Sequence, residues 1–111
     1  MESREMYRQG DVLVLPLARD ELPQPLIRAP RDRRNRMVLA LGEATGHAHI
    51  VTGDGVSLLC PPDDPSRLFL LIEGHGRLVH DEHGPIALGP GAYRVVRQRE
   101  YAPGAIRPVA D

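Results

Sequence analysis

Short apolar stretches alternate with turn-forming residues along the chain. Valine, isoleucine, leucine and tyrosine fill the stretches, and eleven glycines and eleven prolines among 111 residues interrupt them too often for long helices. Short strands joined by frequent turns are typical of small barrels and sandwiches. The pattern therefore predicts an all-β fold, a small single-domain barrel or sandwich over residues 1–111. The expected strands are residues 11–17, 37–41, 46–51, 56–60, 68–73, 77–80, 85–88 and 92–101.

Segments rich in glycine and proline mark the expected turns and loops. The Gly-Asp-Gly segment at 53–55 supplies the positive φ angles of a tight hairpin between two strands. The Gly-Pro-Gly segment at 89–91 is expected to form a turn before the last strand. Residues 19–36 are rich in proline and arginine and are long for a structureless connection, so we expect a loop there that is either mobile or functional, such as a lid.

Four of the five histidines fall in two tight clusters, which carry the most specific chemistry in the sequence. His47 and His49 belong to one predicted strand, where residues two apart project to the same face. His80 and His83 lie at the end of another strand. Residues three apart cannot share a face of a regular strand, so their convergence requires a bend at residues 81–82. Given that bend, the sequence predicts that three or four of these imidazoles meet around one metal ion, with His47, His49, His80 and His83 as the candidate ligands.

Imidazole nitrogens are suitable ligands for zinc, iron, nickel and copper, so the expected cofactor is one divalent transition metal of this group. Glu43, Asp81 and Glu82 are candidates either for an oxygen ligand or for an acceptor that orients an imidazole. A site with three histidines leaves a position open for a small-molecule ligand and for catalysis, whereas a closed site with four would stabilise the fold or sense metal. The alternative for each single histidine is a hydrogen-bonded core residue or a solvated surface residue.

The remaining histidine and the single cysteine are expected to lie outside the site. His75 stands between glycines in a predicted turn, where its side chain is exposed. Cys60 precedes two prolines and is expected to be a small buried apolar residue. A single cysteine also excludes an intramolecular disulfide. No motif in the sequence identifies catalytic residues.

The charge of the chain favours no large anionic partner. A net charge of −1 gives no field that would recruit nucleic acid or an anionic membrane. No apolar run approaches the ~20 residues of a transmembrane helix, and the first residues lack the pattern of a secretory signal. We therefore expect a cytoplasmic protein with no membrane partner. A homodimer is an open alternative, because exposed edges of small barrels often pair.

A second interpretation assigns function to the last predicted strand. Alternation places Tyr93, Arg97, Arg99 and Tyr101 on one face, where aromatic and guanidinium groups can stack bases and contact phosphates. The chain would then be a β-sheet interaction module that binds protein or single-stranded nucleic acid. The competing interpretation is an exposed edge strand whose charges discourage aggregation. The arginine-rich run at 31–36 is likewise either a solvated loop or a second nucleic-acid contact.

Around the first histidine pair the sequence resembles the cupins, small metal-binding β-barrels of the jelly-roll type. The cupin motif has a glycine, five residues, His-x-His, three or four residues and a glutamate. Gly42, His47 and His49 follow this order with one residue fewer after the glycine, and only Asp54 stands where the acid belongs. The resemblance covers residues 40–96 and implies a metal in a β-barrel without a particular activity. Residues 7–12, 42–49 and 93–101 also resemble a group of small uncharacterised bacterial and phage proteins.

Overall fold

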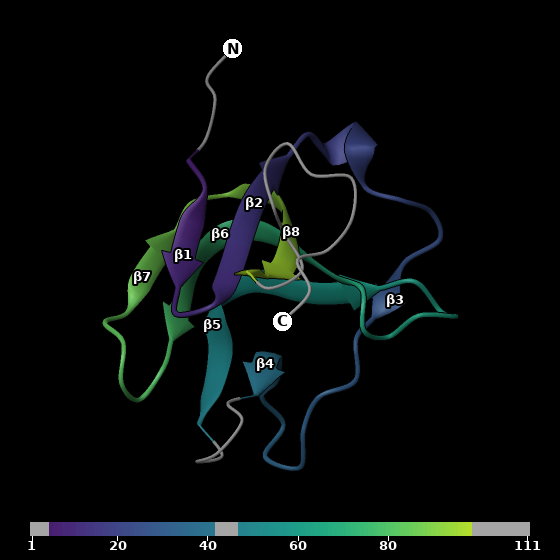
Figure 1. Ribbon diagram of the computed structural model, residues 1–111. Helices are drawn as coiled ribbons and strands as arrows, with labels where there is room; N and C mark the ends of the chain where they lie inside the picture. The colour runs from purple at the N-terminus through teal and green to yellow at the C-terminus, as the bar shows by residue number, and fades with distance from the viewer. Residues whose placement is uncertain (1–4, 42–46, 99–111) are drawn as a thin grey trace.

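The computed structural model describes residues 5–41 and 47–98, which form strands and one short 3-10 turn (Figure 1). The prediction of an all-β fold is confirmed. No helix among these residues is long and apolar enough to cross a membrane. The strands are β1 (Tyr7–Gln9), β2 (Val12–Leu17), β3 (Ile27–Arg28), β4 (Met37–Leu41), β5 (Ala48–Cys60), β6 (Leu68–Val79), β7 (Ile86–Leu88) and β8 (Gly91–Arg97), and the 3-10 turn η1 is Arg19–Glu21.

The two longest strands each replace two predicted ones. β5 covers most of the predicted 46–51 and 56–60, and β6 covers most of 68–73 and 77–80. The predicted tight hairpin at 53–55 is therefore wrong. The segments on both sides of it pair with the same partner, β6, so 53–55 lies within a continuous ladder. The chain reverses instead at residues 61–67, between β5 and β6.

A glycine-rich bend lets β5 and β6 extend through both layers of the structure. Gly53 has a φ of 137°, a backbone conformation that favours glycine. The register of the ladder shifts between Asp54 and Val56, and such a β-bulge bends the strand. A Cβ on Gly53 would collide with the carbonyl oxygen of His75, and one on Gly74 would lie 2.6 Å from that of Asp54. The two backbones approach so closely that both positions require glycine.

The bend divides the sheet into two layers that share β5 and β6. The first layer has the antiparallel order β1-β2-β8-β6-β5-β3. In the second layer, β4 pairs with the first part of β5 and β7 pairs with the last part of β6. Among the described residues the outer strands β1 and β3 do not pair with each other. The closed barrel is therefore not formed, and the arrangement is that of a small open sandwich.

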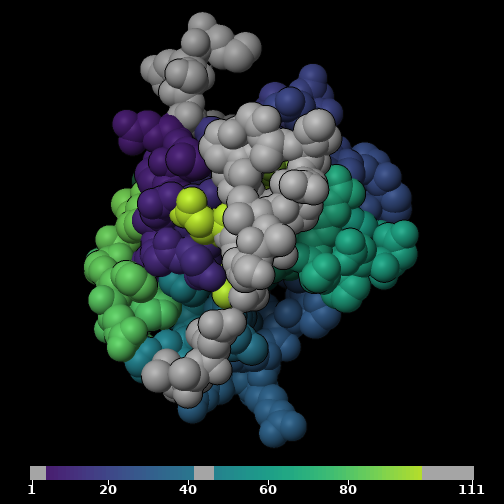
Figure 2. Space-filling model, viewed as in Figure 1, coloured from purple at the N-terminus to yellow at the C-terminus, as the bar shows by residue number. Residues whose placement is uncertain are grey.

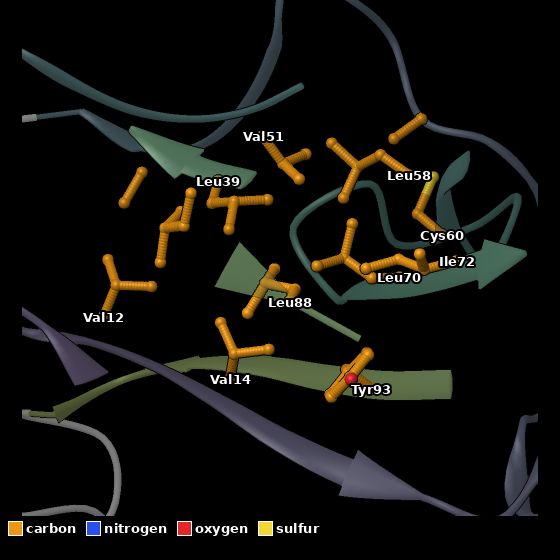
Figure 3. Packing of buried hydrophobic residues seen from close by; sticks show 13 residues of the cluster. Val12, Val14, Leu39, Val51, Leu58, Cys60, Leu70, Ile72, Leu88 and Tyr93 are labelled. Atoms are coloured by element: carbon orange, nitrogen blue, oxygen red, sulfur yellow. The ribbon is translucent and has the colours of Figure 1, made fainter. Parts of the chain in front are cut away.

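The facing sides of the two layers enclose one hydrophobic core (Figure 3). Val12 and Val14 are two residues apart on β2, so their side chains project to the same face and both enter this core, while Leu13 between them is buried outside this cluster. Leu70 and Ile72 on β6 repeat this pattern, and Tyr93 of β8 packs beside them. Burying one leucine or isoleucine stabilises a fold by about 1.5–3 kcal/mol, so this core holds the ends of β5 and β6 in place.

The segment of residues 19–36 is more regular than the sequence predicted. It contains η1 and the two-residue strand β3, which pairs with the end of β5. Asp32 orders the part that follows, because its carboxylate accepts bonds from the backbone N–H groups of Arg34 (3.0 Å) and Arg36 (2.7 Å) and from Nε of Arg36 (2.7 Å). The backbone N–H of Arg36 thereby lowers the pKa of Asp32 below its usual value. The arginine-rich run is thus a fixed turn.

Candidate functional site

Three segments that are distant in the sequence meet at one end of the molecule. They are the turn between β1 and β2, the start of β5, and the segment that follows β6 (Figure 1). In Figure 2 the purple atoms of the N-terminal strands lie directly against the green atoms of the segment after β6. The two histidine clusters come from the second and third of these segments.

The imidazole rings of both clusters are neighbours. Ring centroids are 4.2 Å apart for His49 and His80, 4.7 Å for His80 and His83, 5.7 Å for His47 and His80, and 6.0 Å for His49 and His83. Two imidazoles that bind one metal at about 2.1 Å have ring centroids roughly 5 Å apart. The separation of the rings therefore matches that of metal ligands. His75, by contrast, is exposed, as predicted, although it lies within β6 and not in a turn.

His49 is the central and most enclosed member, with 4% of its surface exposed. Its Nδ1 lies 3.0 Å from Oε1 of Gln9. The amide nitrogen of Gln9 donates to the carbonyl oxygens of Leu78 (3.1 Å) and Gly84 (2.9 Å), which can only accept. The amide of Gln9 therefore has one possible orientation, with its oxygen toward His49. Nδ1 of His49 must carry the proton, and Nε2 presents a lone pair.

Burial lowers the pKa of His49 to about 4; the charge of His80 adds to this effect and that of Asp11 opposes it. The ring is consequently neutral across the physiological range. A neutral imidazole whose second nitrogen is held by an acceptor is the form that coordinates metals.

Asp11 places a carboxylate on the other side of His49. Its Oδ1 is 3.9 Å from Nε2 of His49. Its Oδ2 accepts bonds from Nε (3.0 Å) and a terminal nitrogen (2.7 Å) of Arg97, a paired contact that fixes the carboxylate. Burial raises the pKa of Asp11, but the hydrogen bonds and charge of Arg97 outweigh it, and the net shift is downward. The carboxylate is therefore ionised beside a neutral imidazole.

The bend required between His80 and His83 is present, since residues 81–83 form bends after β6 ends at Val79. The backbone N–H of Glu82 donates to Nδ1 of His80 at 3.0 Å. Side chains on this segment are half-buried or exposed, so they are the least constrained part of the cluster.

His47 lies beside the two acidic residues that the sequence singled out. Its Nε2 is 3.6 Å from Oδ2 of Asp81, and its Nδ1 is 3.6 Å from Oε1 of Glu82. Nδ1 is nevertheless buried and has no hydrogen-bond partner among residues 5–41 and 47–98. A buried polar nitrogen without a partner costs about 1–3 kcal/mol, so this atom favours a group that would satisfy it. Glu43, the third acidic candidate, lies outside the described residues.

Gly10 closes the site from the β1–β2 turn. It has a φ of 59°, and a Cβ placed on it would lie 3.0 Å from Nε2 of His83 and 3.1 Å from Cε1 of His49. Glycine is favoured here both because φ is positive and because a Cβ would crowd the two imidazole rings. The turn can therefore lie directly against the two imidazoles.

The donor atoms do not yet converge on one point. Within residues 5–41 and 47–98, no three histidine, cysteine, aspartate or glutamate side chains are arranged to hold a metal ion as they stand. Two ligand atoms on a tetrahedral metal lie about 3.4 Å apart, compared with 3.9 Å between Nε2 of His49 and Oδ1 of Asp11. Cys60 is fully buried in the core and takes no part, as predicted.

One residue of the alternative binding face on the last strand, Tyr93, is not available for stacking. Tyr93 is fully buried in the core, and its hydroxyl donates to the carbonyl oxygen of Gly89 at 2.7 Å. Arg97 is engaged with Asp11. The prediction that this face is exposed is therefore wrong for Tyr93, because β8 is central, between β2 and β6, and not at an edge. Arg99 and Tyr101 lie outside the described residues.

Sequence reasoning missed three members of this site: Gln9, Asp11 and Arg97. They contribute the acceptor for His49, the nearby carboxylate and the guanidinium that holds it. Gln9 and Asp11 flank Gly10, and a polar-glycine-polar turn carries no signal of its own. The pairing of β2 with β8 sets Val12 opposite Arg97 and so brings Arg97 to Asp11, while the carbonyl groups of Leu78 and Gly84 position Gln9 beside His49.

Comparison with known proteins assigns the chain to a family. Residues 8–98 match the family described as Domain of unknown function (DUF8820). The chain belongs to this family. The DUF8820 match spans the β1–β2 turn and both histidine clusters, and it agrees with the likeness to small uncharacterised proteins; it identifies neither a cupin nor a metal-binding family. No curated protein and no solved structure matches the chain.

Proposed function

We propose that this DUF8820 domain binds one divalent transition metal at the histidine cluster, with Nε2 of His49 as the first ligand. The observation that carries the proposal is the chain of hydrogen bonds from the Leu78 and Gly84 carbonyls through Gln9 to His49, called the Gln9 relay below. Two backbone carbonyls orient the Gln9 amide, and the amide fixes the tautomer of a buried, neutral His49. An acceptor on the distal nitrogen is the usual support of a metal-bound imidazole.

The remaining ligands come from the other three histidines. Nε2 of His83 lies against Gly10 next to His49, and Nδ1 of His47 lacks a hydrogen-bond partner in the described part of the chain. His80 has to give up the bond from Glu82 or turn its ring before it coordinates, because a neutral imidazole has a single acceptor nitrogen. The exposed segment after β6 permits these small rotations. We therefore propose that metal binding orders this segment.

The donor set favours zinc, iron, nickel or copper over magnesium and calcium, which prefer oxygen ligands. With three imidazoles bound, one position remains for Asp11, for water or for a small molecule. A metal in such a site polarises a carbonyl or lowers the pKa of water to about 7. The likeness to the cupin motif supports the same reading, and a small-molecule ligand or substrate is part of this proposal.

Metal analysis of protein purified without a histidine tag and without chelators tests the proposal. We expect about one equivalent of metal per chain, and saturable binding of zinc or nickel to the stripped protein by calorimetry. His49→Ala should weaken binding by more than about 100-fold, since it removes the ligand with the fixed tautomer.

His75→Ala is the matched control, because His75 is exposed on the same hairpin and far along β6 from the cluster. It should bind metal as the wild type does. Absence of metal from the wild type with no binding by calorimetry, or equal losses in both variants, would contradict the proposal.

A further inference from the structure

A groove lined by arginines lies on the surface beside the bend of β5. Its volume is about 500 Å³, within the range of small-molecule sites. Arg28 at the end of β3 and Arg31 and Arg36 from the fixed turn all line it. Together they bring three guanidinium groups to one small cavity in a chain whose net charge is −1. Arg36 is paired with Asp32 at 2.7 Å, so among the described residues Arg28 and Arg31 are the groove arginines without an acidic partner.

Two of the three arginines of the groove, Arg31 and Arg36, are held in place before any ligand arrives. Asp32 fixes Arg36 through its backbone N–H and its Nε, and Arg31 donates to the carbonyl oxygen of Asn35 at 3.0 Å. Asn35 has a φ of 63°, which closes the turn. The side chain of Arg28 makes no hydrogen bond or ion pair with any described residue. A prearranged guanidinium loses less entropy when it binds an anion.

The other lining residues leave room for an uncharged part of a ligand. Met37 and Val56 provide apolar contact, and the hydroxyls of Thr52 and Ser57 provide hydrogen-bonding groups. One carboxylate, that of Glu73, also lines the groove, but it pairs with Arg19 at 3.4 Å. Mixed apolar and polar walls with a few charged groups are typical of small-molecule sites.

We propose that this groove binds a small molecule that carries a phosphate or carboxylate group. The planar fork of a guanidinium matches both anions through paired hydrogen bonds. The site is independent of the metal proposal, since none of its lining residues is a proposed metal ligand. A second groove of about 380 Å³ shares Arg36 and Ile50 with the first and is also lined by Asp81.

Calorimetric titration of the metal-stripped protein with pyrophosphate, and separately with citrate, tests this inference and distinguishes the two anions. Stripping is necessary because both probes bind metals. Matched additions of sodium chloride measure the effect of ionic strength. We expect saturable binding of at least one probe with one site per chain.

Arg28→Gln is the decisive variant, because Arg28 is exposed and its replacement does not disturb the core. It should lower the affinity about tenfold, as expected for loss of one charged contact. Arg8→Gln is the control, because Arg8 is also exposed but lies on β1, at the opposite end of the first layer. The affinity of this variant for the anion should equal that of the wild type.

Three results would overturn the inference: no saturable binding of either anion, equal losses in the two variants, or tighter binding of a single-stranded oligonucleotide than of both small anions. His49→Ala should still bind the anion, so failure of the metal site and failure of this groove give different outcomes.

Discussion

The two ends of the β5–β6 pair use the same two strands in opposite ways. Beyond the glycine bend, Leu58, Leu70 and Ile72 fill the core with apolar side chains that need only the right volume. Before the bend, apolar Val51 and Leu78 still reach the core, but one buried position is occupied by His49. Nδ1 of His49 lies 3.0 Å from Oε1 of Gln9, and its Nε2 lies 3.9 Å from Oδ1 of Asp11. An apolar core such as the one beyond the bend is sufficient for folding. Burial of the His49 imidazole removes polar atoms from water at a cost in free energy, and this cost points to a role in binding.

The largest expected effect is at the apolar end. Leu70 is fully buried, so Leu70→Ala should lower the free energy of unfolding by about 2–5 kcal/mol through lost contacts and a cavity. Urea unfolding followed by circular dichroism measures this change. The folded Leu70→Ala protein should bind metal with the affinity of the wild type. A loss of metal affinity without a loss of stability would show that packing at the apolar end determines the geometry of the polar end.

The polar end, unlike the apolar end, should make the stability of the protein depend on pH. The pKa of His49 falls from 6.5 to about 4 on folding, so between these values the unfolded chain binds more protons. The stabilisation is complete above pH 6.5 and is lost as pH falls toward 4, by up to about 3 kcal/mol. Urea unfolding of metal-stripped protein at several pH values measures this. His49→Gln should flatten the curve in that window, and identical curves would refute the assignment to His49.

Removal of the relay should affect both stability and binding. Gln9→Ala removes the acceptor of a buried imidazole N–H and one donor to the Leu78 carbonyl, and the unsatisfied N–H costs about 1–3 kcal/mol. The affinity for zinc should fall about 10–100-fold, as for other supporting residues of metal-bound histidines. Arg8→Ala, one residue away and exposed, serves as the control. If Gln9→Ala destabilises the protein but keeps full affinity, the relay is structural only.

The smallest expected effect concerns the partly exposed pair of Asp11 and Arg97. Asp11→Asn should lower the free energy of unfolding by at most about 1 kcal/mol, because solvent screens the pair. It should also lower the pKa of His49 further, since the charge of Asp11 raises that pKa. An NMR titration of the His49 ring measures the shift, with Asp63→Asn on an exposed loop as the control. A rise in the pKa would contradict this geometry.

The apolar end could be predicted from the sequence to a large extent. Continuous short apolar runs bounded by polar, glycine or proline residues located β2 and β4 almost to the residue, because strands whose two faces are both largely covered are apolar throughout. The hairpin predicted at residues 53–55 was wrong, because glycine permits both a hairpin turn and a bend within a strand. Only the pairing of both halves with β6 decides between them.

The polar end could be predicted only in part. The two histidine clusters and the bend between His80 and His83 were readable, since they depend on local spacing. The partners of His49 were not, because Gln9 lies 40 residues before it, and the position of Gln9 depends on carbonyl groups near residues 78 and 84. Such contacts come from the topology of the sheet and leave no local pattern.

The most direct test of the central claim is a long-range proton–nitrogen NMR spectrum of the histidine rings, recorded on metal-stripped protein at neutral pH and again after addition of zinc. We predict that His49 carries its proton on Nδ1, and that its unprotonated Nε2 signal shifts strongly with one equivalent of zinc while the signals of His75 stay unchanged. A proton on Nε2 of His49, or an unchanged His49 spectrum with zinc present, would contradict the account.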